Sequence, residues 1–228
     1  MRFLNRAPTL WCLLLAACTT GEGSGNVTSE NLYVRDCYRG PFALNPTFFG
    51  ANPYGNDTIS IRAQRGDDLL EVSDGLTITV DGVAKIRGEA LGEPIQVALP
   101  AGVTPPGVPV TARAVRAPVS MALYLHESCN VQNGAIYSLC GSITFESLFS
   151  GDLNEGNSED RLTEARFAAV FGDPREAAGQ DIPAPEDFAQ TGGCSAEDLA
   201  GHNPELLSLV EGHFTFFFQR GPPAQPFP

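Results

Sequence analysis

Alternating aromatic residues in the last third of the chain constrain its fold more strongly than any other feature. Successive side chains of a β-strand point to opposite faces, so residues two positions apart face the same side. Three segments show this alternation, and their same-face residues are Ile143, Phe145 and Phe149; Ala165, Phe167, Ala169 and Phe171; and Phe214, Phe216 and Phe218. We expect the three segments to be strands that contribute one phenylalanine-rich face of a sheet.

Short apolar runs upstream are further strand candidates. They are residues 32–37, 58–63, 69–72, 76–80, 83–91, 95–99, 110–115 and 119–125. The pairs Asp74-Gly75 and Asp81-Gly82 lie between such runs and are typical of hairpin turns, because glycine tolerates the positive φ that these turns require.

Helix signals are scarce and lie near the C-terminus. Ser195 is a candidate N-cap followed by acidic residues, and Asn203-Pro204 is a second candidate start with proline at the first helical position. Many short strands with few helices predict a mainly β fold. We expect an antiparallel β-sandwich or a flattened barrel, with one or two short helices near the C-terminus.

Residues 38–56 are rich in proline, glycine and asparagine, which predicts a long loop. This loop carries Phe42, Phe48, Phe49 and Tyr54. Exposed aromatic side chains can stack on sugars or bind apolar groups, so the loop is a possible ligand site. The alternative is that Phe48 and Phe49 close an open end of the core.

The first 17 residues have the features of an export signal. Arg2 and Arg6 precede an apolar run at residues 10–17, which ends in small residues before Cys18. The run is shorter than the roughly 20 apolar residues that a membrane-spanning helix needs. An ordinary cleaved secretory signal and a buried N-terminal helix are both alternatives.

The segment Leu15-Ala16-Ala17-Cys18 resembles the end of a bacterial lipoprotein signal. The resemblance implies that Cys18 becomes the mature N-terminus and carries acyl chains, so that the membrane is a partner through those chains. Thr19 follows Cys18, and the resemblance favours the outer membrane because an aspartate there would favour the inner one. The expected location is the bacterial cell envelope.

The expected domain organisation follows from these features. Residues 1–17 are the signal peptide, and residues 18–31 are the lipidated cysteine with a flexible tether, since residues 19–31 are small, polar and glycine-rich. A single β-rich domain spans residues 32–220. Residues 221–228 form a proline-rich tail, where proline prevents a strand from continuing.

The charge of the chain excludes some partners. Loss of Arg2 and Arg6 from the 14 basic residues leaves 12 against 27 acidic ones, a side-chain charge of −15. Such a charge repels nucleic acid, and it also opposes electrostatic adhesion to anionic membranes.

Four cysteines remain once Cys12 and Cys18 are set aside: Cys37, Cys129, Cys140 and Cys194. An even number in an exported chain suggests two disulfides, with three connectivities open. Pairing of Cys129 with Cys140 would require a four-residue loop between two strands. We favour Cys37–Cys129 with Cys140–Cys194, because these bridges close longer loops and restrict the unfolded chain more.

Motifs for chemistry are weak. No G-x-S-x-G serine motif is present. His126 and Cys129 could form a nucleophile pair or half a zinc site, although a disulfide at Cys129 is the expected role. Residues 152–164 alternate oxygen ligands like a calcium loop, but Gly156 falls at the fifth position rather than the sixth, so we expect a solvated acidic loop. We therefore predict no catalytic residue, metal ligand or cofactor.

These observations favour a non-enzymatic, lipid-anchored protein of the cell envelope with a structural or interaction role, whose partner is another envelope protein. A ligand-binding β-domain for a carbohydrate or a small apolar molecule is the alternative. A hydrolase is the third hypothesis.

Overall fold

The fold is that of a computed structural model. It describes residues 19–55, 57–66, 73–100, 103, 117–129, 134–152, 154–176, 193–195, 198–199 and 202–218. The strand candidates at 69–72 and 110–115, the signal, Cys18 and the tail at 221–228 lie outside the described residues. The described strands are β1 (Thr19–Val34), β2 (Tyr38–Leu44), β3 (Phe48–Tyr54), β4 (Thr58–Gln64), β5 (Asp74–Asp81), β6 (Pro94–Ala98), β7 (Val119–Leu125), β8 (Ala135–Ser147), β9 (Leu162–Gly172) and β10 (Ser208–Phe218).

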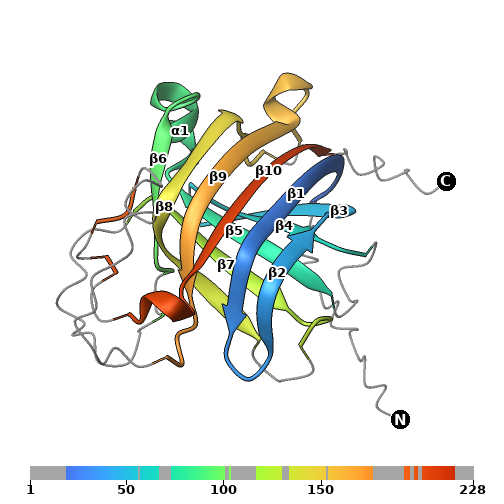
Figure 1. Cartoon of the computed structure of the whole chain (residues 1–228). Helices are drawn as coiled ribbons and strands as arrows, with labels where there is room; N and C mark the ends of the chain where they lie inside the picture. Colours follow the sequence, from blue (N-terminus) through green and yellow to red (C-terminus); the bar gives the residue numbers. More distant parts are fainter. Residues whose placement is uncertain are drawn as a thin grey trace, which may run out of the picture.

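The strands form one sheet that closes on itself. Neighbouring strands follow the order β1, β3, β4, β5, β7, β8, β9 and β10, and β10 pairs back with β1 from Gly21↔Phe218 to Thr28↔Glu211. β6 lies between β7 and β8, and β2 pairs with the second half of β1. β8, β9, β10 and β1 run side by side along one wall, while β3, β4, β5 and β7 cross behind them (Figure 1). This arrangement confirms the mainly β class and corresponds to the flattened barrel.

Aromatic side chains fill the interior, as the alternation predicts. Phe145, Phe171, Phe214, Phe216 and Phe218 are each at most 2% exposed, and they come from the adjacent strands β8, β9 and β10. The ring of Phe216 stacks on that of Phe49 from the opposite wall, with centroids 5.0 Å apart. The prediction of one phenylalanine-rich face is therefore confirmed.

Residues 19–31 are not a flexible tether, because β1 begins at Thr19. Gly21, Gly23 and Gly25 lie directly across from Phe218, Phe216 and Phe214 on β10. A Cβ atom on Gly25 would lie 2.6 Å from the carbonyl oxygen of His213 and 2.8 Å from the Cβ of Phe214. These glycines therefore allow the close approach of two strands, and the folded domain includes β1 from Thr19, well before the start predicted at residue 32.

The strand predicted at residues 83–91 is wrong, since Val83–Glu89 forms the helix α1. Gly82 adopts the left-handed conformation at its start, with φ 73°. The turn before β4 supports this start, because the side chain of Asp57 accepts a hydrogen bond of 2.8 Å from the backbone N–H of Ala84. Neither Asp-Gly pair forms a two-residue hairpin turn, because Asp74-Gly75 opens β5 and Asp81-Gly82 leads into α1.

One of the two predicted C-terminal helix starts is confirmed. Pro204–Leu206 forms a 3-10 turn, and the side chain of Asn203 accepts a hydrogen bond of 3.1 Å from the N–H of Glu205. The α-helix found among the described residues lies instead between β5 and β6. Within the same residues, no helix has the length and apolarity needed to cross a membrane.

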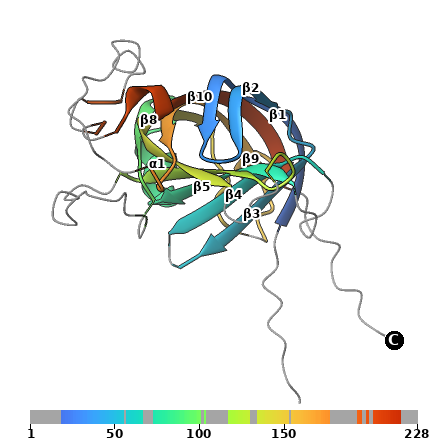
Figure 2. The same ribbon diagram turned by 60° about the horizontal axis from the view of Figure 1, so that its bottom comes forward.

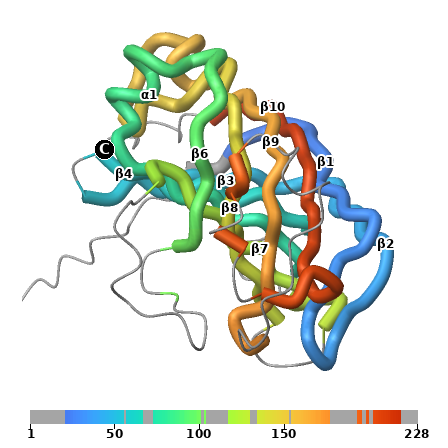
Figure 3. The backbone as a smooth tube through the Cα atoms, turned by 60° about the vertical axis from the view of Figure 1, so that its left-hand side comes forward, coloured from blue at the N-terminus to red at the C-terminus, as the bar shows by residue number. Residues whose placement is uncertain are grey.

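The barrel has two ends, the N-terminal end and the disulfide end. The N-terminal end carries the start of β1, the end of β10, the β3–β4 turn, α1 and the β8–β9 connection; Figure 3 shows the last two together at the top. The disulfide end carries the β1–β2 turn at residues 35–37 and the turn after β7 at residues 126–128. Figure 2 brings this second end forward, with the β1–β2 hairpin in view.

Candidate functional site

Both predicted disulfides are confirmed. Cys37 and Cys129 join the β1–β2 turn to the segment that follows β7, with their Cα atoms 5.4 Å apart. Cys140 and Cys194 join β8 to a segment near the C-terminus, with Cα atoms 5.0 Å apart. Cys129 is therefore not a free thiol, and the nucleophile or zinc role considered for it with His126 is wrong.

Each disulfide has its own surroundings. Cys37–Cys129 adjoins the main core at the disulfide end. Cys140–Cys194 adjoins a smaller apolar cluster on the outside of the barrel wall, which contains Leu139, Val170, Leu199 and Leu207. The second bridge thus fastens a late segment of the chain against β8 and β9.

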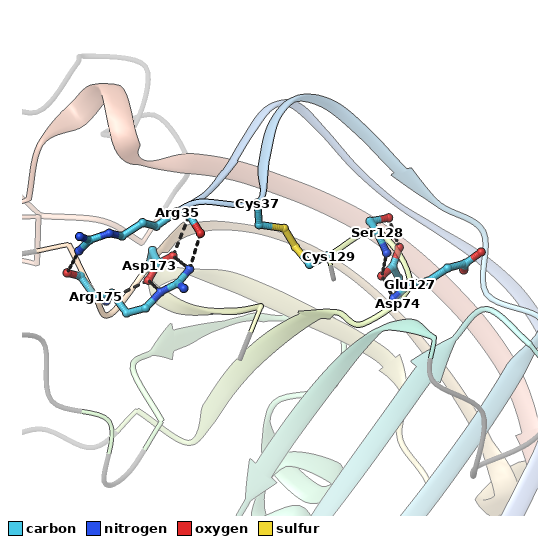
Figure 4. Close-up of a disulfide and its surroundings, with 8 residues drawn as sticks. All are labelled: Arg35, Cys37, Asp74, Glu127, Ser128, Cys129, Asp173 and Arg175. Atoms are coloured by element: carbon cyan, nitrogen blue, oxygen red, sulfur yellow. Dashed lines mark hydrogen bonds and ion pairs between the residues drawn. A yellow bond between two sulfur atoms is a disulfide. The ribbon is translucent and has the colours of Figure 1, made fainter. Parts of the chain in front are cut away.

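Two buried carboxylates flank the Cys37–Cys129 bridge (Figure 4). Asp74, at the start of β5, is 1% exposed and accepts hydrogen bonds of 3.0 Å from the backbone N–H groups of Glu127 and Ser128. The hydroxyl of Ser128 also donates to Asp74 at 2.5 Å. This carboxylate holds the turn that leads into Cys129.

Asp173 is the second carboxylate, and it follows β9. Its oxygens accept hydrogen bonds of 2.9 Å from the N–H of Arg35, the N–H of Arg175 and the Nε–H of Arg175. Burial alone would raise the pKa of this carboxyl, but the bonds from Arg175 and Arg35 outweigh it and lower the pKa. The same contact with Asp173 raises the pKa of Arg175. Asp173 is therefore an ionised group with both oxygens already engaged.

Arg35, just after β1, and Arg175, just after β9, each donate a side-chain hydrogen bond to the backbone of the other. Arg175 donates from Nη2 to the carbonyl oxygen of Arg35 at 2.8 Å, and Arg35 donates from Nη1 to that of Arg175 at 3.0 Å. Nearby, the hydroxyl of Tyr33 donates to Glu176 at 2.9 Å. Burial, followed by this carboxylate, raises the pKa of Tyr33. The cluster therefore fastens residues 173–176 to the end of β1.

A small hollow lies beside this cluster and is lined in part by Asp173, Glu176, His202 and Leu206. Its volume of about 10 Å³ is room for about one water molecule. His202 is 8% exposed, and burial lowers its pKa because the charged imidazolium loses its hydration. The hollow is too small for a sugar or another organic ligand.

The predicted aromatic ligand loop is not a loop. Phe42 lies in β2, and Phe48, Phe49 and Tyr54 lie in β3. Phe42, Phe48 and Phe49 are at most 8% exposed, and Phe42 and Phe49 pack in the main core, whereas Tyr54 is 47% exposed. The sheet tolerates Pro41 because β2 is an edge strand. Among the described strands it pairs only with β1, so a missing N–H on its other side breaks no ladder hydrogen bond. An exposed aromatic platform formed by these four residues is therefore wrong.

The acidic segment at residues 152–164, expected to be a solvated loop rather than a calcium loop, connects β8 to β9. Its side chains bond within the segment, for example from the N–H of Asn154 to Asp152 at 2.8 Å and from Asn157 to Asp160 at 2.9 Å. Asp160 also pairs with Arg87 of α1. In the part of the chain that the structure describes, no three His, Cys, Asp or Glu side chains are placed to hold a metal ion.

Sequence reasoning missed Asp74, Asp173 and Arg175. Asp74 carried a turn signal, and Asp173 stands directly after an apolar strand, where a polar residue is expected in any case. Their role depends on partners far along the chain.

No protein-family model, curated protein or solved structure matches this chain.

Proposed function

We propose that this chain is a lipid-anchored protein of the bacterial cell envelope that acts through its surface, in a structural or interaction role, and not as an enzyme. The observation that carries the proposal is Leu15-Ala16-Ala17-Cys18, followed at once by a folded strand from Thr19. Cleavage immediately before Cys18 would leave the whole of β1 in the mature chain, because the described strand runs from Thr19.

The disulfides support export. Disulfides form and persist in oxidising compartments such as the periplasm and the cell surface. Cys37–Cys129 and Cys140–Cys194 both join segments distant in sequence, so they suit a domain that matures outside the cytoplasm. Thr19 favours the outer membrane within the envelope.

The interior of the barrel supports a role at the surface. Side chains of the described strands pack the space inside the ring into one apolar cluster. Of the four aromatic residues proposed for ligand binding, Phe42 and Phe49 belong to this core, and Phe48 is also buried. These facts weigh against a carrier of sugars or apolar molecules, and they favour a rigid body whose outer face meets another envelope protein.

Lipidation tests the proposal directly. The full chain is expressed in a Gram-negative bacterium with a labelled fatty acid, and its membrane and soluble fractions are compared for three chains: wild type, Cys18→Ala and Cys12→Ala. We expect Cys18→Ala to lose the label and to leave the membrane fraction. Cys12→Ala is the matched control, because Cys12 lies in the discarded signal, and it should behave as wild type. Label retained by Cys18→Ala would refute the anchor.

Crosslinking tests the interaction role. A photo-crosslinking residue at exposed positions of the disulfide end, such as Asp36 or Glu127, should capture one defined envelope protein in intact cells. The same residue at a buried position such as Phe216 should capture none. A uniform absence of crosslinks at the outer faces of all ten strands would contradict the interaction role.

A further inference from the structure

Exposed hydrophobic side chains gather at one end of the barrel. Among the described residues, three large hydrophobic side chains are exposed: Tyr54 by 47%, Leu91 by 41% and Phe217 by 39%. Tyr54 is the last residue of β3, Leu91 follows α1, and Phe217 is the penultimate residue of β10. All three therefore lie at the N-terminal end, the end at which β1 begins.

Polar contacts join this end into one rim. The carbonyl oxygen of Asp57, in the β3–β4 turn, accepts a hydrogen bond of 2.8 Å from Gly82 at the start of α1. Arg87 of α1 pairs with Asp160 of the β8–β9 connection. Beyond α1, the N–H of Gly92 donates to the carbonyl oxygen of Phe145 on β8 at 2.9 Å. These contacts connect the β3–β4 turn, which follows Tyr54, to α1, which precedes Leu91.

Covalent geometry places the predicted anchor at the same end. The Cα atom of Cys18 lies about 3.8 Å from that of Thr19, because consecutive Cα atoms are that far apart across a trans peptide. Thr19 pairs with Ala51 on β3, and Tyr54 lies three residues further along that strand. At roughly 3.3 Å per residue, Tyr54 lies about 10 Å further along β3 than the residue paired with Thr19, past the start of β1.

We propose that the N-terminal end of the barrel rests on the bilayer, with Tyr54, Leu91 and Phe217 at the lipid interface. The proposal depends on the lipidation of Cys18 proposed above. With no tether between Cys18 and β1, the acyl chains draw this end of the barrel against the headgroups. Tyrosine suits that position because its ring enters the apolar layer while its hydroxyl stays hydrated.

The contact is apolar and not electrostatic. Asp57, Asp81 and Asp160 lie at the same end, and they oppose attraction to anionic lipid. Docking should therefore occur on zwitterionic vesicles and should be insensitive to salt. The orientation directs the disulfide end, with the Asp173 cluster, away from the membrane.

Tryptophan fluorescence tests the orientation. Trp11 is the one tryptophan of the chain and lies in the predicted signal, so the mature protein has none. The lipidated protein is purified as Tyr54→Trp, Leu91→Trp and Phe217→Trp variants and reconstituted into phosphatidylcholine vesicles, with or without bromine on the acyl chains. Glu127→Trp, at the disulfide end with a side chain 53% exposed, is the matched control.

We expect the three N-terminal-end variants to show a blue shift on vesicles and to lose emission on brominated chains, while Glu127→Trp shows neither change. Flotation of each sample in a density gradient separates the two proposals. Protein that floats but is not quenched at Tyr54, Leu91 or Phe217 overturns the docking face and leaves the anchor standing. Protein that does not float overturns the anchor and the docking face with it. A blue shift that depends on protein concentration, without quenching by lipid, would assign the face to a second copy of the chain and overturn lipid docking.

Discussion

Gly25→Ala tests the strand that replaces the predicted tether. The added Cβ would lie 2.6 Å from the carbonyl oxygen of His213 and 2.8 Å from the Cβ of Phe214, neither of which is the end of a flexible side chain. Carbon atoms in favourable contact are about 3.5–4.0 Å apart, so β1 and β10 must separate by roughly 1 Å. The substitution therefore strains a strand pair that closes the barrel.

The size of the effect follows from two opposing contributions. Overpacking a core costs about 1–3 kcal/mol. Restriction of the unfolded chain by alanine offsets about 0.4–1 kcal/mol of that. A net loss of about 1–2 kcal/mol lowers Tm by roughly 2–8 °C in a domain of this size, where each kcal/mol corresponds to about 2–4 °C.

Thermal unfolding of the oxidised protein, followed by circular dichroism, measures this loss. The matched control is Gly88→Ala, because Gly88 lies within α1 and no heavy atom lies within 4 Å of the Cβ that alanine adds. That variant should gain about 0.5–1 kcal/mol from the helix preference of alanine. Residues of a flexible tether would tolerate alanine. An unchanged or raised Tm for Gly25→Ala would therefore refute the pairing of Gly25 with Phe214.

Two further predictions concern the disulfide end. The double variant Cys37→Ser/Cys129→Ser should lose about 4–5 kcal/mol of stability relative to wild type in urea unfolding. The reason is that the bridge spans 92 residues and the loop-closure entropy it removes from the unfolded chain grows with that separation. A loss under about 1 kcal/mol would contradict the bridge. Asp173→Asn should lose about 2–3 kcal/mol at pH 7, because it removes hydrogen bonds to a buried charged group, whereas Asp36→Asn, with a side chain 75% exposed, should lose nothing. The folded state lowers the pKa of Asp173 below its ordinary value of 3.8, so its stabilisation is present above that pH and disappears as the pH falls through the folded-state pKa. The free energy of unfolding of wild type and both aspartate variants is measured across pH 2–7. The difference between wild type and Asp173→Asn should shrink in acid, and a difference that is constant with pH would refute the ionised state of Asp173.

Several features of the fold could be predicted because they are encoded locally. The alternation in β8, β9 and β10 needs no partner to be recognised, since a period of two by itself specifies a strand with one apolar face. The start at Asn203-Pro204 was also recognisable, because its cap lies within two residues of the group that it satisfies. The disulfide pairing was predicted correctly from the longer loops that the two bridges close.

Other features were missed because local composition gave the wrong signal. Residues 83–91 alternate like a strand, yet Gly82 and the contact of Ala84 with Asp57 start a helix there. Residues 38–56 have the proline and glycine content of a loop, but Phe42 and Phe49 bury their rings in the core and draw both segments into the sheet. Burial outweighs weak local preference in the second case, and a local turn with its hydrogen bond does so in the first.

By itself, the sequence determined the β class, favoured the disulfide pairs that the structure shows and predicts an exported chain, because strand alternation, cysteine number and the pattern of a signal are properties of neighbouring residues or of counts. Only the tertiary structure decided that Gly21, Gly23 and Gly25 face three phenylalanines almost 200 positions later. The same is true of the closure of the ring by β1 and β10, and of the gathering of Tyr54, Leu91 and Phe217 at the end where β1 begins. The physical reason is that the effect of a glycine or of an exposed ring depends on what the partner strand places opposite or beside it, and that choice is made by packing across the whole barrel.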